Sequence, residues 1–361
     1  MPTAFRFSVL AAVTLATTPA IASDIKTFKD WVAACDNLRN CSAYGFNPDG
    51  YGAYLRVERG GAAEAPIRIT LSVDPQGAAS YRAAFDPALP GLPQGAISGA
   101  KEGEGNDYRR TVLIDNASAE PLLASIRSAK AIVVTFQAEP GQKLDTPKLS
   151  ISMSGAVAAL LWIDDQQKRV GTTTAMIKRG DKSASTIPPL PKPPVIVATR
   201  PSNETAPAKP PAALANKGRA LCGDDDKKSK LDNMYPLGGG QLLYEFSCPD
   251  SSGAYNFQSV YMVGPAANPQ AAQPVSFKWP IKIGDAAQDG PSNGLINADF
   301  NKDTLTLSSF SKGRGIGDCG SVEDWVWDGK TFQLAGVSMM SECNGVPPDD
   351  WPTLYKTEIK R

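Results

Sequence analysis

The chain has 361 residues, of which 42% are hydrophobic and 20% charged, a composition typical of a globular protein longer than one domain. Lysine and arginine together number 37, as do aspartate and glutamate, so no basic surplus indicates nucleic acid as a partner. Six cysteines are present and histidine is absent, which excludes Ser-His-Asp triads, Cys-His dyads and histidine metal ligands.

The first 22 residues have the pattern of a secretory signal peptide. Arg6 is their only charged side chain, an apolar run from Phe7 to Leu15 follows, and Ala20-Ile21-Ala22 offers a small-residue cleavage site. The apolar run is shorter than the roughly 20 residues that a membrane-spanning helix needs. We therefore predict a periplasmic protein that is cleaved after Ala22 and has no membrane span.

Residues 23–182 are predicted to form an α+β domain dominated by antiparallel sheet. Two helices are expected, one over residues 119–128 and one that begins with Ser154 as its N-cap and ends near Gly171. Short segments rich in β-branched and aromatic residues, bounded by Gly, Pro, Asp or Asn, predict strands at 27–35, 53–59, 66–73, 108–114, 131–137 and 148–153.

A proline-rich segment follows at residues 183–216, where nine prolines stand among Ala, Lys, Ser and Thr. Such a composition favours extended polyproline II and cannot close a core, so it predicts a semi-rigid linker. The chain is thus expected to consist of a signal peptide (1–22), an N-terminal domain (23–182), the linker and a C-terminal domain (217–361).

The C-terminal domain is predicted to be an antiparallel β sandwich or barrel without a long helix. Asp328-Gly329 supplies the backbone angles of a tight hairpin turn, and aromatic residues on both arms, among them Phe332, can pair across the strands. Strand patterns occur at 241–248, 255–263, 274–279, 295–300, 304–310, 323–327 and 331–334. The whole protein is therefore expected to be mainly β.

The even number of cysteines in an exported chain predicts structural disulfides. The four C-terminal cysteines permit three connectivities, and the sequence does not choose among them. Pairing cysteines by proximity gives Cys35–Cys41, Cys222–Cys248 and Cys319–Cys343. The first disulfide closes a short loop and is expected to stabilise the fold by about 2 kcal/mol, and each of the other two by about 3 to 4 kcal/mol. No C-x-x-C is present and the spacings do not suit zinc, so neither a metal nor a cofactor is expected.

Several spaced motifs resemble the bacterial domain-of-unknown-function family 1176. They are FKDW at 28–31 with Cys35 and Cys41, residues 158–175, Cys248 with GAYN at 253–256, GRGIGDCG at 313–320, residues 325–332, Cys343 and Asp350-Trp351. This resemblance implies an exported, periplasmic protein of a family without an established activity. A shorter likeness, limited to Phe28-x-Asp30-Trp31 and Cys35, points to the invasion-associated locus B family.

Two patterns could suggest a hydrolase. Ser309 and Lys312 satisfy Ser-x-x-Lys, but the companion motifs of penicillin-binding enzymes are missing and the pair lies on a predicted strand, so we interpret it as a chance match. Asp164 and Asp165 are adjacent on a predicted helix and should point in different directions, which disfavours a shared acid–base role. No catalytic residue is therefore predicted, although paired carboxylates can hydrolyse glycosides without histidine.

Two acidic segments could suggest a metal site. Residues 299–303 resemble the opening of a calcium loop, but Thr304 and Phe310 occupy the positions of its glycine and glutamate. A polar turn between strands is expected there instead. Residues 224–226, beside Cys222, are predicted to form a solvated acidic loop.

The densest motif, GRGIGDCG, offers a candidate binding surface made of Arg314, Asp318 and Trp325. An arginine beside aromatic residues can form a recognition surface. The alternative is structural, because the glycines permit an irregular loop whose arginine and aspartate satisfy buried backbone groups.

These observations predict a non-catalytic periplasmic binding or interaction protein whose partner is an unknown envelope protein or small ligand. An alternative is a proteinaceous inhibitor or modulator of an envelope enzyme such as a lysozyme, since small disulfide-bonded β domains with exposed loops suit that task. A third hypothesis is an uncharacterised hydrolase.

Overall fold

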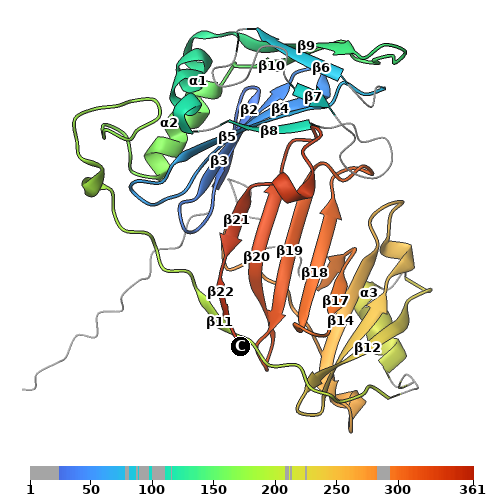
Figure 1. The fold of residues 1–361 in the computed structure, drawn as a ribbon. Helices are drawn as coiled ribbons and strands as arrows, with labels where there is room; N and C mark the ends of the chain where they lie inside the picture. Colours follow the sequence, from blue (N-terminus) through green and yellow to red (C-terminus); the bar gives the residue numbers. More distant parts are fainter. Residues whose placement is uncertain are drawn as a thin grey trace, which may run out of the picture.

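The protein is mainly β with several antiparallel sheets, as predicted (Figure 1). The described residues contain three α-helices, one more than the sequence indicated. The computed structural model describes residues 24–77, 81–86, 88, 97–99, 110–114, 116–207, 211, 214–223, 226–282 and 293–361. The predicted signal peptide lies outside these residues. Below, the N-terminal half means residues 24–182 and the C-terminal half means residues 215–361.

Two antiparallel sheets build the N-terminal half. The six-stranded sheet has the order β1 (Asp24–Phe28), β2 (Trp31–Cys35), β3 (Cys41–Asn47), β4 (Gly50–Arg59), β5 (Ile67–Val73) and β8 (Arg110–Ile114). The four-stranded sheet has the order β10 (Lys148–Ser152), β9 (Ala131–Ala138), β6 (Tyr81–Asp86) and β7 (Ile97–Gly99). Both sheets share one core with α1 (Asn116–Ser128) and α2 (Ala156–Gln166).

Helix α2 begins one residue later than predicted, because its N-cap is Gly155 and not Ser154. Gly155 has a φ of 99°, and a Cβ atom at this position would lie 1.7 Å from the carbonyl oxygen of Phe28. Only glycine fits so close an approach. The helix also ends before Gly171, because Lys168 leaves the helical conformation with a φ of 61°.

Two further sheets build the C-terminal half. One contains β12 (Lys230–Gly238), β13 (Gln241–Ser247), β14 (Gln258–Pro265) and β15 (Gln273–Pro274), with β16 (Gly294–Ile296) also paired to β14. The other has the order β17 (Asp299–Asn301), β18 (Thr306–Lys312), β19 (Gly320–Trp327), β20 (Phe332–Met340) and β21 (Thr353–Lys356). Buried residues of both sheets form one core. Of the two predicted alternatives, this arrangement corresponds to the sandwich.

Several elements of this half depart from the sequence prediction, among them β21 (Thr353–Lys356) and β22 (Glu358–Lys360), for which no strand was predicted. Helix α3 (Ala215–Cys222) is a short helix that the sequence did not indicate, and it packs so closely on β13 that a Cβ on Gly218 would lie 2.0 Å from the Phe246 ring. Strand β12 was not predicted either, since it contains Pro236 and lies at a sheet edge. Residues 275–279, predicted as strand, supply buried side chains but belong to no strand.

The hairpin predicted around Asp328-Gly329 is confirmed. Trp327 pairs with Phe332 across β19 and β20, with ring centroids 5.3 Å apart. Gly329 has a φ of 94°, and a side-chain oxygen of Asp328 accepts hydrogen bonds from the backbone N–H groups of Lys330 and Thr331, both at 2.8 Å. The turn chemistry thus fixes the register of the two longest strands of this sheet.

Part of the predicted linker is built into the C-terminal half. Strand β11 (Val195–Val197) pairs in parallel with β22 (Glu358–Lys360), the last strand of the chain (Figure 1). Ile196 is buried against Val326 and Ala335. This stretch of the proline-rich segment is therefore held by strand pairing and by a small apolar cluster.

All six cysteines form disulfides, and the pairing by proximity is the observed one. The bridges are Cys35–Cys41, Cys222–Cys248 and Cys319–Cys343. In the part of the chain that the structure describes, no helix is long and apolar enough to cross a membrane.

The two halves meet at a junction that is both apolar and hydrogen-bonded. Its apolar cluster combines Val32, Tyr44, Phe46 and Tyr54 of the first half with Met340, Val346 and Trp351 of the second. Asp350 is its polar centre, because its carboxylate accepts hydrogen bonds from the Tyr54 hydroxyl and from Arg56 Nη1 at 2.7 Å. A large apolar interface between two parts of a chain favours a fixed arrangement over relative motion.

A second contact reinforces this junction at the other end of β2. The Asn37 side chain donates to the carbonyl oxygen of Lys356 at 2.9 Å and accepts from the Lys356 N–H at 2.8 Å. Asn37 thereby pairs with β21 as a backbone strand would. It follows the strand that carries Cys35, whose disulfide with Cys41 closes the turn.

A buried arginine organises the loop between β4 and β5. Arg169 is 0% exposed, and its guanidinium donates to the carbonyl oxygens of Gly60, Ala62 and Ala63 and to the side-chain oxygen of Gln167. Burial lowers the pKa of this guanidinium. The arginine thus satisfies several backbone groups that an apolar side chain would leave unpaired.

Candidate functional site

A cleft of about 850 Å³ lies between the two halves. Its first wall comes from the start of β4 and the turn after β5, and its second wall comes from the loops at 314–318 and 345–348. Volumes of this size are typical of small-molecule sites, which often form where two parts of a protein meet. The GRGIGDCG motif supplies much of the second wall.

Arg314 and Asp318, two of the predicted site residues, form a bidentate ion pair in this wall. Arg314 Nε and Nη2 donate to the two carboxylate oxygens of Asp318 at 2.7 and 2.5 Å, and Nη2 also donates to the carbonyl oxygen of Cys343 at 2.8 Å. Asp318 accepts a further hydrogen bond from the Gly345 N–H at 2.7 Å. Both residues therefore satisfy backbone groups, as the structural alternative predicted.

The ion pair keeps both of its members charged. Hydrogen bonding to Asp318 raises the pKa of Arg314 above its usual value. Burial alone would raise the pKa of Asp318, but the hydrogen bonds from Arg314 and from the Gly345 N–H outweigh it and lower that pKa. A carboxylate held ionised in this way suits a structural or binding role better than proton donation.

The loop that carries the pair is rigid yet presents an apolar tip. The Gly313 N–H donates to the carbonyl oxygen of Cys319 at 2.8 Å, and the Gly317 N–H donates to that of Arg314 at 2.9 Å. The Cys319–Cys343 disulfide anchors its base. Ile316, at the tip, is 70% exposed. Single exposed apolar side chains are common on protein surfaces. On a constrained loop such a side chain loses little conformational entropy when it contacts a partner.

Tyr51 faces this loop from the first wall, and the sequence reasoning did not find it. Its side chain is 52% exposed, and the Arg314 guanidinium carbon lies 5.9 Å from the centroid of its ring, a cation–π distance. A signal was present in the sequence, because Tyr51 and Ile316 are each flanked by glycines, as GYG and GIG. Large apolar residues between two glycines are poor candidates for a strand core.

Trp325, the third predicted site residue, does not lie on this surface. It is 1% exposed and packs in the sandwich core, where its ring meets Phe277 edge to face at 5.1 Å. Its Nε1 donates to the buried carboxylate of Glu323 at 3.3 Å. Trp325 is close to the motif in sequence, but it lies on β19 with its side chain directed to the core.

Ser309 and Lys312 do not form a catalytic pair. Both lie on β18 three residues apart, so their side chains leave opposite faces of the strand. The Ser309 hydroxyl donates to Glu323 at 3.2 Å, while Lys312 Nζ lies 5.3 Å from the Phe310 ring centroid. The motif match therefore reflects ordinary strand residues.

Glu323 is a buried carboxylate whose charge is unfavourable. Burial raises its pKa, and hydrogen bonds from the side chains of Ser321, Trp325 and Ser309 offset this in part. A carboxyl group with a raised folded-state pKa contributes stability that is fully present below its unfolded pKa and is lost as the pH rises through the folded value.

Replacing Glu323 with glutamine is therefore expected to leave the protein at least as stable as the wild type at about pH 8 and to lose that advantage toward about pH 5. The amide keeps an acceptor, and the serine hydroxyls can rotate to accept from it. Urea unfolding at several pH values measures the difference. Asp324→Asn, at the exposed neighbouring position, is the matched control. A Glu323→Gln variant that is less stable by the same amount at every pH would contradict this account.

The acidic segment at residues 299–303 forms the predicted polar turn. Asn301 Oδ1 accepts hydrogen bonds from the N–H groups of Asp303 and Thr304 at 2.9 and 3.1 Å.

The side chains of Asp164 and Asp165 on helix α2 point apart, as expected. Asp164 is buried and accepts from the N–H groups of Met176 and Ile177, whereas Asp165 is exposed.

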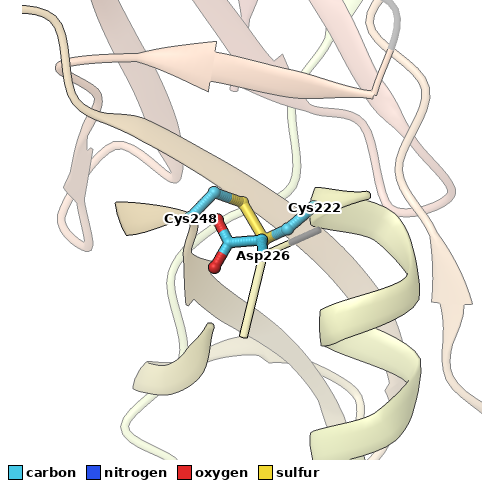
Figure 2. Close-up of side chains that lie close together, drawn as sticks. All are labelled: Cys222, Asp226 and Cys248. Carbon is cyan, nitrogen blue, oxygen red and sulfur yellow. A yellow bond between two sulfur atoms is a disulfide. The ribbon is translucent and has the colours of Figure 1, made fainter. Parts of the chain in front are cut away.

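The solvated acidic loop predicted at 224–226 is wrong for Asp226, the member that the structure describes. Asp226 is 2% exposed and accepts from the N–H groups of Asp250 and Ser251 at 3.1 and 3.3 Å, so it caps a turn. Figure 2 shows its carboxylate beside the Cys222–Cys248 disulfide. Ligand atoms of the three residues lie within 4.8 Å of one another, but both sulfurs are committed to the disulfide and neither is a thiolate.

Fold and cleft together define a disulfide-bonded, mainly β protein with a cleft between its two halves. The chain belongs to the family described as "Protein of unknown function (DUF1176)", whose model matches residues 25–358. It is similar to the uncharacterised protein YpfG of Escherichia coli (strain K12), with 30% identity over 340 residues and 92% of each chain covered. The family resemblance in the sequence is thus confirmed. No solved structure matches the chain.

Proposed function

We propose that this is a non-catalytic binding or interaction protein of the periplasm, and that it recognises its partner at the cleft between the two halves. The main support is the constrained loop that holds Ile316 in solvent at the edge of the cleft. The charged side chains of this wall, Arg314 and Asp318, neutralise each other. Three disulfides are compatible with an exported protein.

The rigidity of the junction also supports recognition by a preformed surface. The hydrogen bonds to Asp350 and the apolar cluster around Trp351 hold the walls in one arrangement. A surface that is already ordered loses little conformational entropy when it binds.

A second candidate is an inhibitor or modulator of an envelope enzyme such as a lysozyme. The observation that favours it is again Ile316, because an apolar side chain on a braced loop can enter the cleft of another protein. Under this alternative the partner contacts the loop tip, and the wall formed by Tyr51 contributes less.

Photo-crosslinking tests the proposal. A benzophenone amino acid in place of Ile316 is expected to form an adduct in the cells that produce the protein, since this position projects from the proposed recognition surface. The same amino acid in place of Val197, which is 68% exposed on β11 and outside the cleft, is the control. Mass spectrometry of the adduct identifies a small ligand or a protein, and an enzyme partner supports the second candidate. Equal yields at the two positions, or no adduct at position 316, would count against the proposal.

A further inference from the structure

We propose that the cleft binds an uncharged saccharide. This inference rests on the proposed function and specifies the chemistry of its ligand. It starts from the charges of the wall. Among the lining residues that the structure describes, Arg314 is the one lysine or arginine. Its Nε and Nη2 are engaged by Asp318 and by the carbonyl oxygen of Cys343. Nη1 of Arg314 makes no hydrogen bond to a residue that the structure describes and remains a donor for a ligand hydroxyl. The lining carboxylates are Asp318, which neutralises Arg314, and Asp74, so the cleft offers an anion no uncompensated positive charge.

An apolar platform is present beside this neutralised pair. The Tyr51 ring is half exposed, and the Arg314 guanidinium makes a cation–π contact with it. The C–H bonds on one face of a pyranose ring are slightly positive and pack against the negative face of an aromatic ring. Pro347, Pro348 and Gly345 of the second wall line the same cleft as this ring.

Gln76 supplies the polar complement. Its side-chain amide makes no hydrogen bond to any residue that the structure describes, although its backbone N–H donates to Asp74 Oδ1 at 3.0 Å. An amide offers an acceptor and two donors, which matches a pair of neighbouring hydroxyl groups that both donate and accept. Gln76 also has a φ of 54°, an unfavourable conformation for a residue other than glycine. Such strain concentrates at binding sites.

An extended peptide fits these walls less well. Strand β4 is paired with β3 on one side and with β5 on the other, so it presents no free edge for strand addition. Tyr54 is buried and its hydroxyl is bound to Asp350, which leaves Tyr51 as the exposed ring of this wall. Grooves for proline-rich peptides are lined by aromatic rings, and one exposed ring does not make such a groove.

The test is a titration of the intact protein with three uncharged probes, cellotriose, maltotriose and N,N′,N″-triacetylchitotriose, followed by saturation-transfer NMR and calorimetry. At least one of these probes is expected to bind saturably. Tyr51→Ala and Gln76→Gly should each weaken that binding at least tenfold. Glycine adopts a φ of 54° without strain, so Gln76→Gly is expected to fold as the wild type does. Val197→Ala, outside the cleft, is the matched control and should bind as the wild type does.

Two results would overturn the inference: no binding of any of the three probes, or binding that Tyr51→Ala leaves unchanged. Tyr51-dependent binding of a proline-rich peptide without any saccharide binding would also overturn it. The proposed function is tested separately, because a protein adduct at position 316 would preserve it even when all three saccharides fail. Failure of both experiments would remove both proposals.

Discussion

Replacing Arg169 with methionine is expected to lower the free energy of unfolding by about 3 kcal/mol, because hydrogen bonds made by a charged group are worth about 1.5 to 3 kcal/mol. Methionine keeps much of the side-chain volume but donates no hydrogen bond. The carbonyl oxygens of Ala62 and Ala63 would then lose the guanidinium donor, while that of Gly60 would keep Gln167 Nε2. Urea unfolding followed by far-ultraviolet circular dichroism measures the loss.

Arg82→Met is the matched control for this experiment. Arg82 forms an ion pair with Glu139, and its side chain is largely exposed. Its replacement is expected to cost less than about 1 kcal/mol, as is usual for surface pairs. Equal losses in the two variants would show that the buried network around Arg169 contributes no more than a surface contact.

Asp350→Ala is expected to lower the free energy of unfolding by about 2 to 3 kcal/mol, because hydrogen bonds to charged groups are worth more than neutral ones. The substitution removes the acceptor of Tyr54 and the counter-charge of Arg56 at the junction of the halves. Its neighbour Asp349 is exposed, and Asp349→Ala is the control.

The same unfolding curves test whether the two halves are coupled. Wild-type protein and the Asp349→Ala variant are expected to unfold in one transition, since each half buries apolar surface on the other. Asp350→Ala weakens that coupling, so its transition should broaden or separate into two. A single sharp transition with unchanged midpoint would mean that Asp350 does not hold the junction together.

Most strands with clear boundaries were predictable from the sequence, including the completely buried β2, whereas β3 and β6 were not. The hairpin at Asp328-Gly329 follows from turn chemistry that acts over a few residues. Strand β3 (Cys41–Asn47) was missed because all of its residues are buried, so it lacks the alternation of apolar and polar residues that identifies a strand. Strand β11 was missed because its three residues stand among prolines, and its partner lies at the far end of the chain.

The residues of the candidate site also divide into some that the sequence located correctly and some that it did not. Arg314 and Asp318 are four residues apart in a glycine-rich motif, and the sequence placed them together correctly. Trp325 was assigned to that surface by proximity in sequence, but strand alternation directs it to the core. Tyr51 and Gln76 come from the opposite half of the protein. Their place in the cleft depends on how the halves pack, which no local pattern encodes.

The parallel pairing of β11 with β22 has a consequence for the order of events during biosynthesis. The last strand of the chain, Glu358–Lys360, holds a segment that was made about halfway through translation. The two hydrogen bonds between the Asn37 side chain and the backbone of Lys356 likewise form only after Lys356 has been made. Although the sheets of the N-terminal half can assemble earlier, these two closures require residues 356–360 to have been made. A truncated or stalled chain would keep its proline-rich segment open, and so would differ from the complete protein in its accessibility to proteases.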